Sequence, residues 1–97
     1  MSYTVPAGKQ DTAQQIIDHY FEELYVQGPG GMRSQCYADY RDDRNFVHLK
    51  SFKRESIANQ HFRSSVFRDF IQKLSTLCGR ELLFTRLNQQ QSFESIY

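Results

Sequence analysis

The sequence predicts one small α+β domain with the element order β-α-β-β-α-β. Two features support this prediction. Apolar residues recur at helical spacing in two separate segments, residues 11–27 and 64–78. Short runs with alternating side chains or β-prone residues lie before, between and after these segments. A chain of 97 residues is long enough for one domain, so residues 1–97 are expected to form a single domain.

The first predicted elements are a short strand and an amphipathic helix. Residues 2–5 are β-prone, and the run stops at Pro6 and Gly8. Asp11 is a suitable N-cap for the helix, because its carboxylate can accept hydrogen bonds from free amides of the first turn. The helix has to end before the Gly-Pro-Gly-Gly run at residues 28–31. Its apolar face carries Ala13, Ile16, Ile17, Tyr20, Phe21 and Leu24.

Residues 32–40 and 46–52 are predicted to form a hairpin of two antiparallel strands. Residues 41–45 between them are mostly charged and contain no β-branched residue, which is typical of a hairpin loop. One face of the first strand carries Met32, Ser34, Cys36 and Ala38, opposite Arg33, Gln35, Tyr37 and Asp39. One face of the second carries Phe46, His48, Lys50 and Phe52, opposite Val47, Leu49 and Ser51.

The second half of the chain predicts a helical region, a last strand and a polar arm. Residues 55–59 form a short helical piece, and either serine of residues 64–65 can cap a longer helix that Gly79 closes. Residues 82–87 are the last strand, and residues 88–97 are a polar arm with a few apolar contact points. The complete order is the split βαβ of a ferredoxin-like fold with a four-stranded antiparallel sheet.

Charge and hydropathy exclude several classes of partner. With 12 basic and 11 acidic residues, the chain lacks the basic excess of a nucleic-acid-binding protein. No segment approaches the roughly 20 apolar residues of a membrane span, and the first residues do not resemble a signal peptide. The two cysteines, Cys36 and Cys78, are not spaced as a disulfide framework or a metal site. We therefore expect a cytoplasmic protein with reduced thiols and no membrane partner.

The predicted sheet has apolar residues on both faces. Two helices can cover only one face of four strands, yet the strand over residues 46–52 carries phenylalanines on one face and Val47 and Leu49 on the other. A second copy of the chain would cover the remaining face. The sequence thus predicts a homodimer with Val47, Leu49 and Leu83 or Leu87 at the contact.

One spacing pattern resembles a known family. An apolar strand ends in an aromatic residue, Phe52, and His61 follows nine residues later. Ser64, Phe67 and Phe70 then stand three, six and nine residues after the histidine. This order resembles the antibiotic biosynthesis monooxygenase family, whose members form dimeric α+β barrels. The turn at residues 6–9 and the glycines at residues 30–31 are also similar to that family.

The chain departs from the family pattern in ways that bear on activity. Phe52 stands where the family usually has Trp, and Lys50 where Glu is common. The haem-degrading branch relies on a Trp and on an Asn of the first strand; this chain has no Trp and no Asn before Asn45, so that activity is not expected. Residues 61–84 are about equally similar to a branch that isomerises a phosphorylated quorum-sensing signal.

The resemblance implies a monooxygenase that oxidises a quinol or a phenolic polycyclic substrate with oxygen and needs no metal, haem or flavin. His61 would assist proton transfer, Lys50 or His48 would stabilise the developing anion, and Phe46 and Phe52 would stack on the ring. The alternative is a small-molecule binding protein, or an isomerase of a phosphorylated signal molecule without redox chemistry. A non-catalytic dimerisation module is a third hypothesis.

Each candidate site residue can be interpreted in two ways from the sequence. His61 can exchange a proton near neutrality, or it can satisfy backbone groups where the helix breaks. Lys50 indicates either a wet cavity or an edge residue that reaches solvent. Ser34 and Cys36 leave room for a ligand, unless large helix side chains fill that space. Two further candidates, able to hold a phenolate or a phosphate, are Tyr37 and Arg33. Convergence of Arg33, Lys50 and His48 would favour a phosphorylated ligand.

Overall fold

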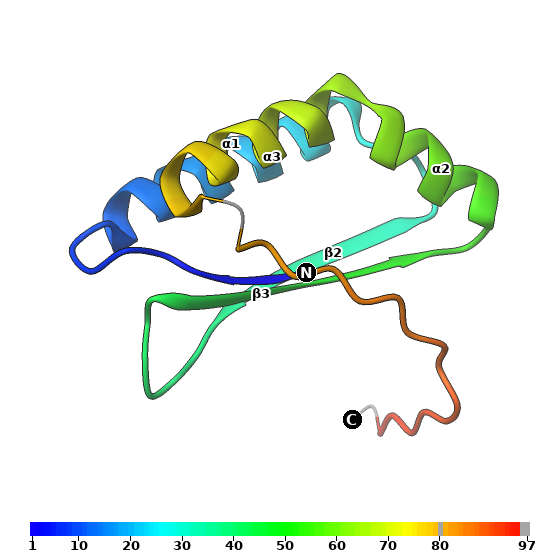
Figure 1. Cartoon of the computed structure of the whole chain (residues 1–97). Coiled ribbons are helices and arrows are strands. Elements are labelled where there is room, and N and C mark those ends of the chain that lie inside the picture. Colours follow the sequence, from blue (N-terminus) through cyan, green and yellow to red (C-terminus); the bar gives the residue numbers. More distant parts are fainter. Residues whose placement is uncertain (80, 96–97) are drawn as a thin grey trace.

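The computed structural model describes residues 1–79 and 81–95 as two layers. An antiparallel sheet forms one layer, and the helices cover one of its faces (Figure 1). None of the helices in these residues is long and apolar enough to cross a membrane. The elements in chain order are β1 (Ser2–Thr4), α1 (Gln10–Gln27), β2 (Met32–Ala38), β3 (Asn45–Phe52), α2 (Glu55–Arg63) and α3 (Ser65–Cys78).

The predicted hairpin is present and forms most of the sheet. The strand order is β1-β3-β2, and both pairings are antiparallel. Met32 pairs with Phe52 at one end of the hairpin, and Ala38 pairs with Phe46 at the other. At the connection, the Asp39 amide donates to the Asn45 carbonyl at 2.8 Å. The first of these strands ends at Ala38, two residues earlier than predicted, because the loop begins at this closing hydrogen bond.

The helix boundaries agree with the prediction at the serine cap before α3. They differ at the start of α1 and at the end of α2, which continues to Arg63, four residues beyond the predicted residue 59. The Ser64 hydroxyl oxygen accepts a hydrogen bond from the Phe67 amide at 3.2 Å, and Gly79 ends α3 with a φ of 70°. The prediction that Asp11 caps α1 was wrong: the N-cap position is Lys9, which makes no side-chain cap, and Asp11 lies inside the first turn. There its negative carboxylate still interacts favourably with the positive end of the helix dipole.

The predicted strand over residues 82–87 is reduced to a single bridge. Ser2 and Leu83 exchange two backbone hydrogen bonds, each 2.9 Å long. β1 is only three residues long and Pro6 follows it closely, so β1 offers few backbone groups for a longer pairing. Beyond Leu83 the chain runs away from the sheet (Figure 1). Ile96 and Tyr97, the end of the predicted arm, lie outside the described residues.

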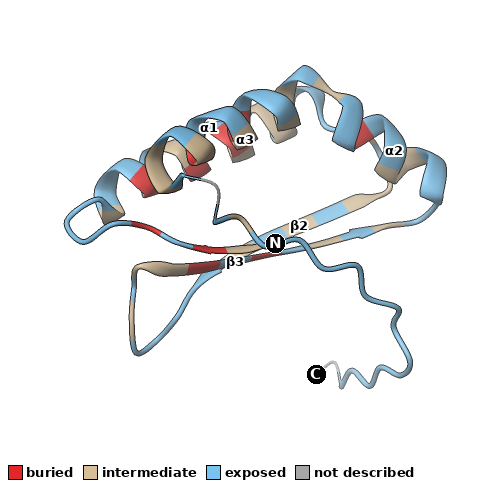
Figure 2. Ribbon diagram, viewed as in Figure 1, coloured by how far each residue is buried: buried red, intermediate tan, exposed pale blue. Residues whose placement is uncertain are grey.

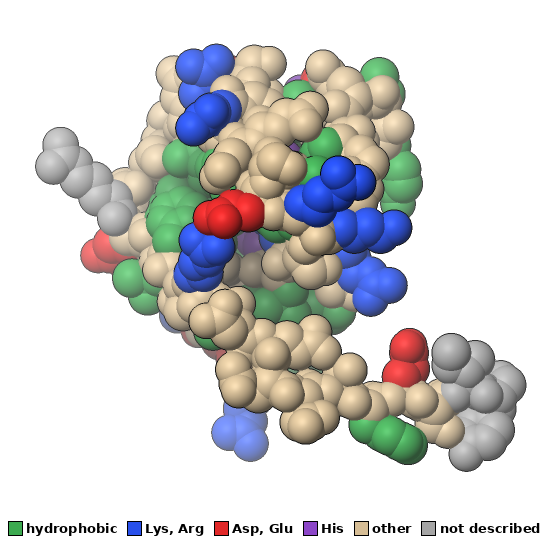
Figure 3. Space-filling view, turned by 90° about the vertical axis from the view of Figure 1, so that its right-hand side faces the viewer, with side chains coloured by type: hydrophobic (Ala, Val, Ile, Leu, Met, Phe, Trp, Pro, Cys, Tyr) green, Lys and Arg blue, Asp and Glu red, His purple; other side chains and the backbone are tan. Residues whose placement is uncertain are grey.

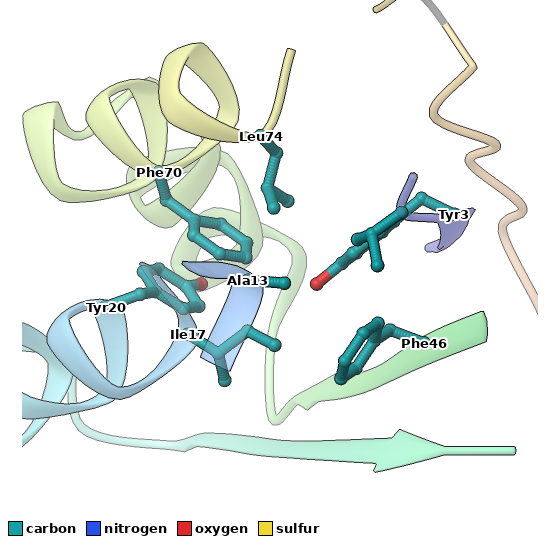
Figure 4. Packing of buried hydrophobic residues seen from close by; sticks show 8 residues of the cluster. Tyr3, Ala13, Ile17, Tyr20, Phe46, Phe70 and Leu74 are labelled. Carbon is teal, nitrogen blue, oxygen red and sulfur yellow. The ribbon is translucent and has the colours of Figure 1, made fainter. Parts of the chain in front are cut away.

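The hydrophobic core lies between the sheet and the pair α1 and α3. Figure 2 shows that buried residues gather on the facing sides of the two layers. The Tyr20 and Phe70 rings are stacked, with 4.0 Å between their centroids. The buried hydrophobic residues, most of them drawn in Figure 4, are Tyr3, Val5, Ala13, Ile17, Tyr20, Phe46, Phe70 and Leu74. By contrast, Val47 and Leu49 on the outer sheet face are 38% and 45% exposed.

Candidate functional site

Four polar side chains of the hairpin lie on the sheet face that the helices cover. The strand register pairs Ser34 with Lys50 and Cys36 with His48. Because neighbouring pairs are two residues apart along each strand, all four side chains share one face. The burial pattern agrees, since these four positions are buried or partly buried while the intervening positions are exposed. The predicted inner face of the hairpin is therefore confirmed.

His48 is fully enclosed and joined to a phenol and a thiol. Its Nε2 atom lies 2.8 Å from the Tyr3 hydroxyl and 3.5 Å from Cys36 Sγ. Only 2% of His48 is exposed, and its Nδ1 atom has no hydrogen-bond partner within the described part of the chain. Burial, with smaller contributions from Lys50 and the N-terminal amine, lowers the pKa of His48 to about 3. The imidazole is therefore neutral near pH 7.

His61 is also enclosed and is paired with a second phenol. Its Nε2 atom lies 2.8 Å from the hydroxyl of Tyr20, a residue of α1, and only 1% of His61 is exposed. Burial, and to a smaller extent Lys50, lowers the pKa of His61 to about 4, so the ring is unprotonated at neutral pH. At the helix break the His61 carbonyl accepts hydrogen bonds from Ser64, whereas the His61 ring bonds to Tyr20. The imidazole itself is not used to satisfy the backbone there.

The ammonium group of Lys50 lies against aromatic rings. Its Nζ atom is 4.9 Å from the ring centroid of Tyr20, 5.3 Å from that of Phe67 and 5.8 Å from that of Phe70. Such contacts stabilise a cation by about 0.5–2 kcal/mol each. Burial, partly offset by Cys36, lowers the pKa of Lys50 to about 8. Lys50 is thus a partly buried cation in contact with three aromatic rings.

Two polar groups beside Lys50, the Ser34 hydroxyl and the Cys36 thiol, have a long hydrogen bond or none within the described residues. The Ser34 hydroxyl is buried and has no hydrogen-bond partner among the residues described. Burial raises the pKa of the Cys36 thiol to about 11, so Cys36 is protonated and a poor nucleophile at neutral pH. The expectation that small residues leave room here is only partly met, because the Tyr20, Phe67 and Phe70 rings fill the space above Lys50.

Sequence reasoning missed the two phenols that complete the site. Tyr3 and Tyr20 occupy buried positions where Phe would pack equally well, and burial raises the pKa of both hydroxyls. A Tyr on the apolar face of a helix or strand is a usable signal, since a buried phenol needs a hydrogen-bond partner. The partner could not be named from the sequence, because it comes from a distant element in each case.

Several predicted site residues do not join this cluster. Arg33 and Tyr37 are exposed, because they occupy the alternate positions of β2 that face away from the helices. Arg33 therefore does not converge with Lys50 and His48. Phe52 adjoins His61 with 5.9 Å between ring centroids, whereas Phe46 packs on Tyr3 at the other end of β3. Of the two predicted stacking residues, only Phe52 lies beside His61.

The surroundings of His61 are closely packed. The ring centroids of Phe62 and Phe67 lie 5.4 Å and 5.2 Å from that of His61. A cavity of about 20 Å³, enough for one water molecule, lies between α1 and α3 and borders Tyr20 and Phe70 on their other side. At the α2 end of the molecule, Figure 3 shows a shallow recess between the layers, with hydrophobic and basic side chains around it.

Solved structures share this fold. A conserved protein from Methanosarcina mazei Go1 has a TM-score of 0.71 and 21% identity, over 82% of this chain and 78% of that one. A provisionally assigned antibiotic biosynthesis monooxygenase from Nitrosomonas europaea has a TM-score of 0.70 and 16% identity, over 81% and 75% of the two chains. A further antibiotic biosynthesis monooxygenase has a TM-score of 0.70 and 12% identity, over 90% and 94%.

Sequence comparisons add no closer relative. No family model matches the chain, and no curated protein matches it. At identities of 12–21%, the structural likeness establishes a common fold. The resemblance seen in the spacing of Phe52 and His61 is therefore confirmed at the level of the fold. This chain has the α+β fold of the antibiotic biosynthesis monooxygenase structures.

Proposed function

We propose that this chain is a cofactor-independent monooxygenase that acts on a quinol or a phenolic polycyclic compound. The common fold with monooxygenase structures supports the class of reaction. The observation that carries the proposal is the Tyr20–His61 hydrogen bond of 2.8 Å, set beside the Lys50 ammonium on an aromatic wall. This arrangement combines a neutral base, a cation and ring surfaces, which are the groups that deprotonation of a phenol requires.

In the proposed reaction the substrate is its own reductant. Neutral His61 accepts a proton from a phenolic hydroxyl, and the Lys50 cation stabilises the resulting phenolate. The electron-rich ring then reduces oxygen: one molecule of quinol and one of O₂ give one hydroxyquinone and one water, so that no external reductant is needed. Phe52 would stack on the substrate ring beside His61. The proposal includes no metal, haem or flavin.

The proposed assembly is a homodimer that covers the outer sheet face. Val47 and Leu49 are 38% and 45% exposed on that face. Leu83, which bridges to Ser2 of β1, is 67% exposed, and Leu87 is 75% exposed. Tyr37, which pairs with Val47 across the hairpin, is 51% exposed. Exposed apolar side chains on one sheet face are typical of a protein interface. A second copy of this chain would provide a matching apolar face.

Oxygen uptake with hydroquinone-like substrates tests the proposed activity. Metal-free protein without added cofactor should consume oxygen, and His61→Gln should lower turnover by roughly 10²–10⁴-fold, as expected for loss of a positioned base. Gln is the matched variant because its side chain can still bond to the Tyr20 hydroxyl. His19→Gln, at an exposed position of α1, should leave turnover unchanged.

Two results would contradict the proposal. If oxygen uptake in His61→Gln fell only in proportion to the folded fraction, measured by circular dichroism, then His61 would have a structural role. If no quinol consumed oxygen but a phosphorylated sugar-like compound bound, an isomerase or binding protein would replace the monooxygenase. The outward position of Arg33 favours the monooxygenase, because it removes one of the three groups, Arg33, Lys50 and His48, expected around a phosphate.

A further inference from the structure

Lys50 differs from the other lysines of the chain in its surroundings. Lys9, Lys53 and Lys73 are exposed, whereas Lys50 is partly buried on the inner sheet face. The ion pairs of the described residues are His19–Glu23, Asp42–Arg44 and Glu55–Arg86, so Lys50 has no carboxylate partner among them. A buried amine without a counterion is less stable in its charged form.

Among the described residues, none of the titratable groups that face Lys50 is a carboxylate. They are Tyr20 of α1, His61 of α2, Cys36 of β2, His48 of β3 and the N-terminal amine of Met1. The four side chains are neutral near pH 7, the amine repels the Lys50 charge, and only the ring contacts, including those of Phe67 and Phe70 from α3, favour the cation. With the pKa of Lys50 lowered to about 8, about one molecule in ten carries the free amine at pH 7. For an unperturbed lysine the fraction is on the order of 10² times smaller.

We propose that Lys50 is a carbonyl-condensing lysine that forms an imine with a small aldehyde or ketone whose body is planar and apolar. The Nζ lone pair forms a bond to the carbonyl carbon, and the carbonyl oxygen leaves as water with the two amine hydrogens. The step needs no oxidant or reductant. The rings of Tyr20, Phe67 and Phe70 would pack against the body of the carbonyl compound.

The Tyr20–His61 pair lies next to this amine and can move the protons that the condensation requires. The Tyr20 hydroxyl bonds to His61, and the centroid of the same Tyr20 ring lies 4.9 Å from Lys50 Nζ. Loss of water from the first adduct needs a proton on the leaving hydroxyl, and a phenol–imidazole pair can supply and recover one. This inference is independent of the proposed monooxygenase activity, because oxygen takes no part in it.

Reductive trapping tests the inference on the intact chain. Wild-type protein is incubated anaerobically at pH 7 with benzaldehyde and cyanoborohydride, which reduces an imine to a stable secondary amine, and the labelled residues are identified by peptide mass spectrometry. We expect Lys50 to be labelled at least about tenfold faster than Lys9, Lys53 and Lys73, because more of its amine is free. Lys50→Arg should abolish the fast label, and Lys53→Arg should leave it unchanged.

Unfolded protein provides a control that needs no variant. In urea the four lysines should be labelled at similar rates, because the surroundings of Lys50 are then lost. The rate at Lys50 in the folded chain should rise with pH and level off above about pH 8. Equal labelling of all four lysines in folded protein would overturn the inference. So would an unlabelled Lys50 beside labelled exposed lysines, since the amine would then be inaccessible.

Discussion

The two buried histidines predict that the protein loses stability steeply in mild acid. In the folded chain, burial lowers the pKa of His61 to about 4 and that of His48 to about 3, from 6.5. Between pH 6.5 and these values the unfolded chain therefore binds more protons than the folded chain, and the free energy of unfolding falls as the pH falls. At about 1.4 kcal/mol per pKa unit, each histidine removes ~3 kcal/mol between pH 7 and pH 4.

A combined loss of about 6 kcal/mol is comparable to the whole stability of a typical small domain, which is about 5–15 kcal/mol. Urea unfolding followed by far-ultraviolet circular dichroism at pH 7, 6, 5 and 4 measures it. His61→Gln removes one of the two titrating groups and should roughly halve the dependence on pH. The reasoning would be refuted by an unfolding free energy that stays constant within about 1 kcal/mol over this range.

Three further predictions concern single substitutions. Lys50→Met should raise the melting temperature, since it replaces a partly buried cation by an apolar side chain of similar length; a lower melting temperature would contradict this. The same substitution should slow quinol turnover. Leu49→Lys should shift the mass measured by light scattering from dimer to monomer, or unfold the chain, and a wild-type monomer at micromolar concentration would exclude the proposed interface. Gly31→Ala should lower the free energy of unfolding, measured by urea titration, by about 1–3 kcal/mol, because Gly31 has a φ of +82° and a Cβ there would lie 2.8 Å from Ile57 Cδ1. Gly30→Ala is the control: the space around Gly30 is open, so its effect in the same titration should be small.

The alternation of side chains in the hairpin was enough to predict the inner face of the sheet. The pattern of His48 and Lys50 against Val47 and Leu49 separates the two faces because the side-chain period of a strand is two. The serine before α3 was predictable for a similar reason, since a cap depends on local backbone geometry. These features are decided by residues that are near one another in the sequence.

The remaining features depend on contacts between distant elements. The length of the last strand is limited by the short β1, so the alternation within residues 82–87 did not determine it. The filling of the space above Lys50 depends on the rotamers of Phe67 and Tyr20, which no periodicity describes. The two phenol–imidazole pairs bring together residues 41 and 45 positions apart, and only the packing of helices on the sheet defines them.

Product analysis under ¹⁸O₂ tests the central claim most directly. Metal-free wild-type protein is incubated with a hydroquinone-like substrate and ¹⁸O₂ in ordinary water, without added cofactor, and the product is analysed by mass spectrometry. If the Tyr20–His61 pair and Lys50 support the proposed reaction, the hydroxyquinone should contain one ¹⁸O atom, and His61→Gln should form it far more slowly. Product whose new oxygen comes from water, or no enzymatic product above the spontaneous rate, would contradict the monooxygenase proposal.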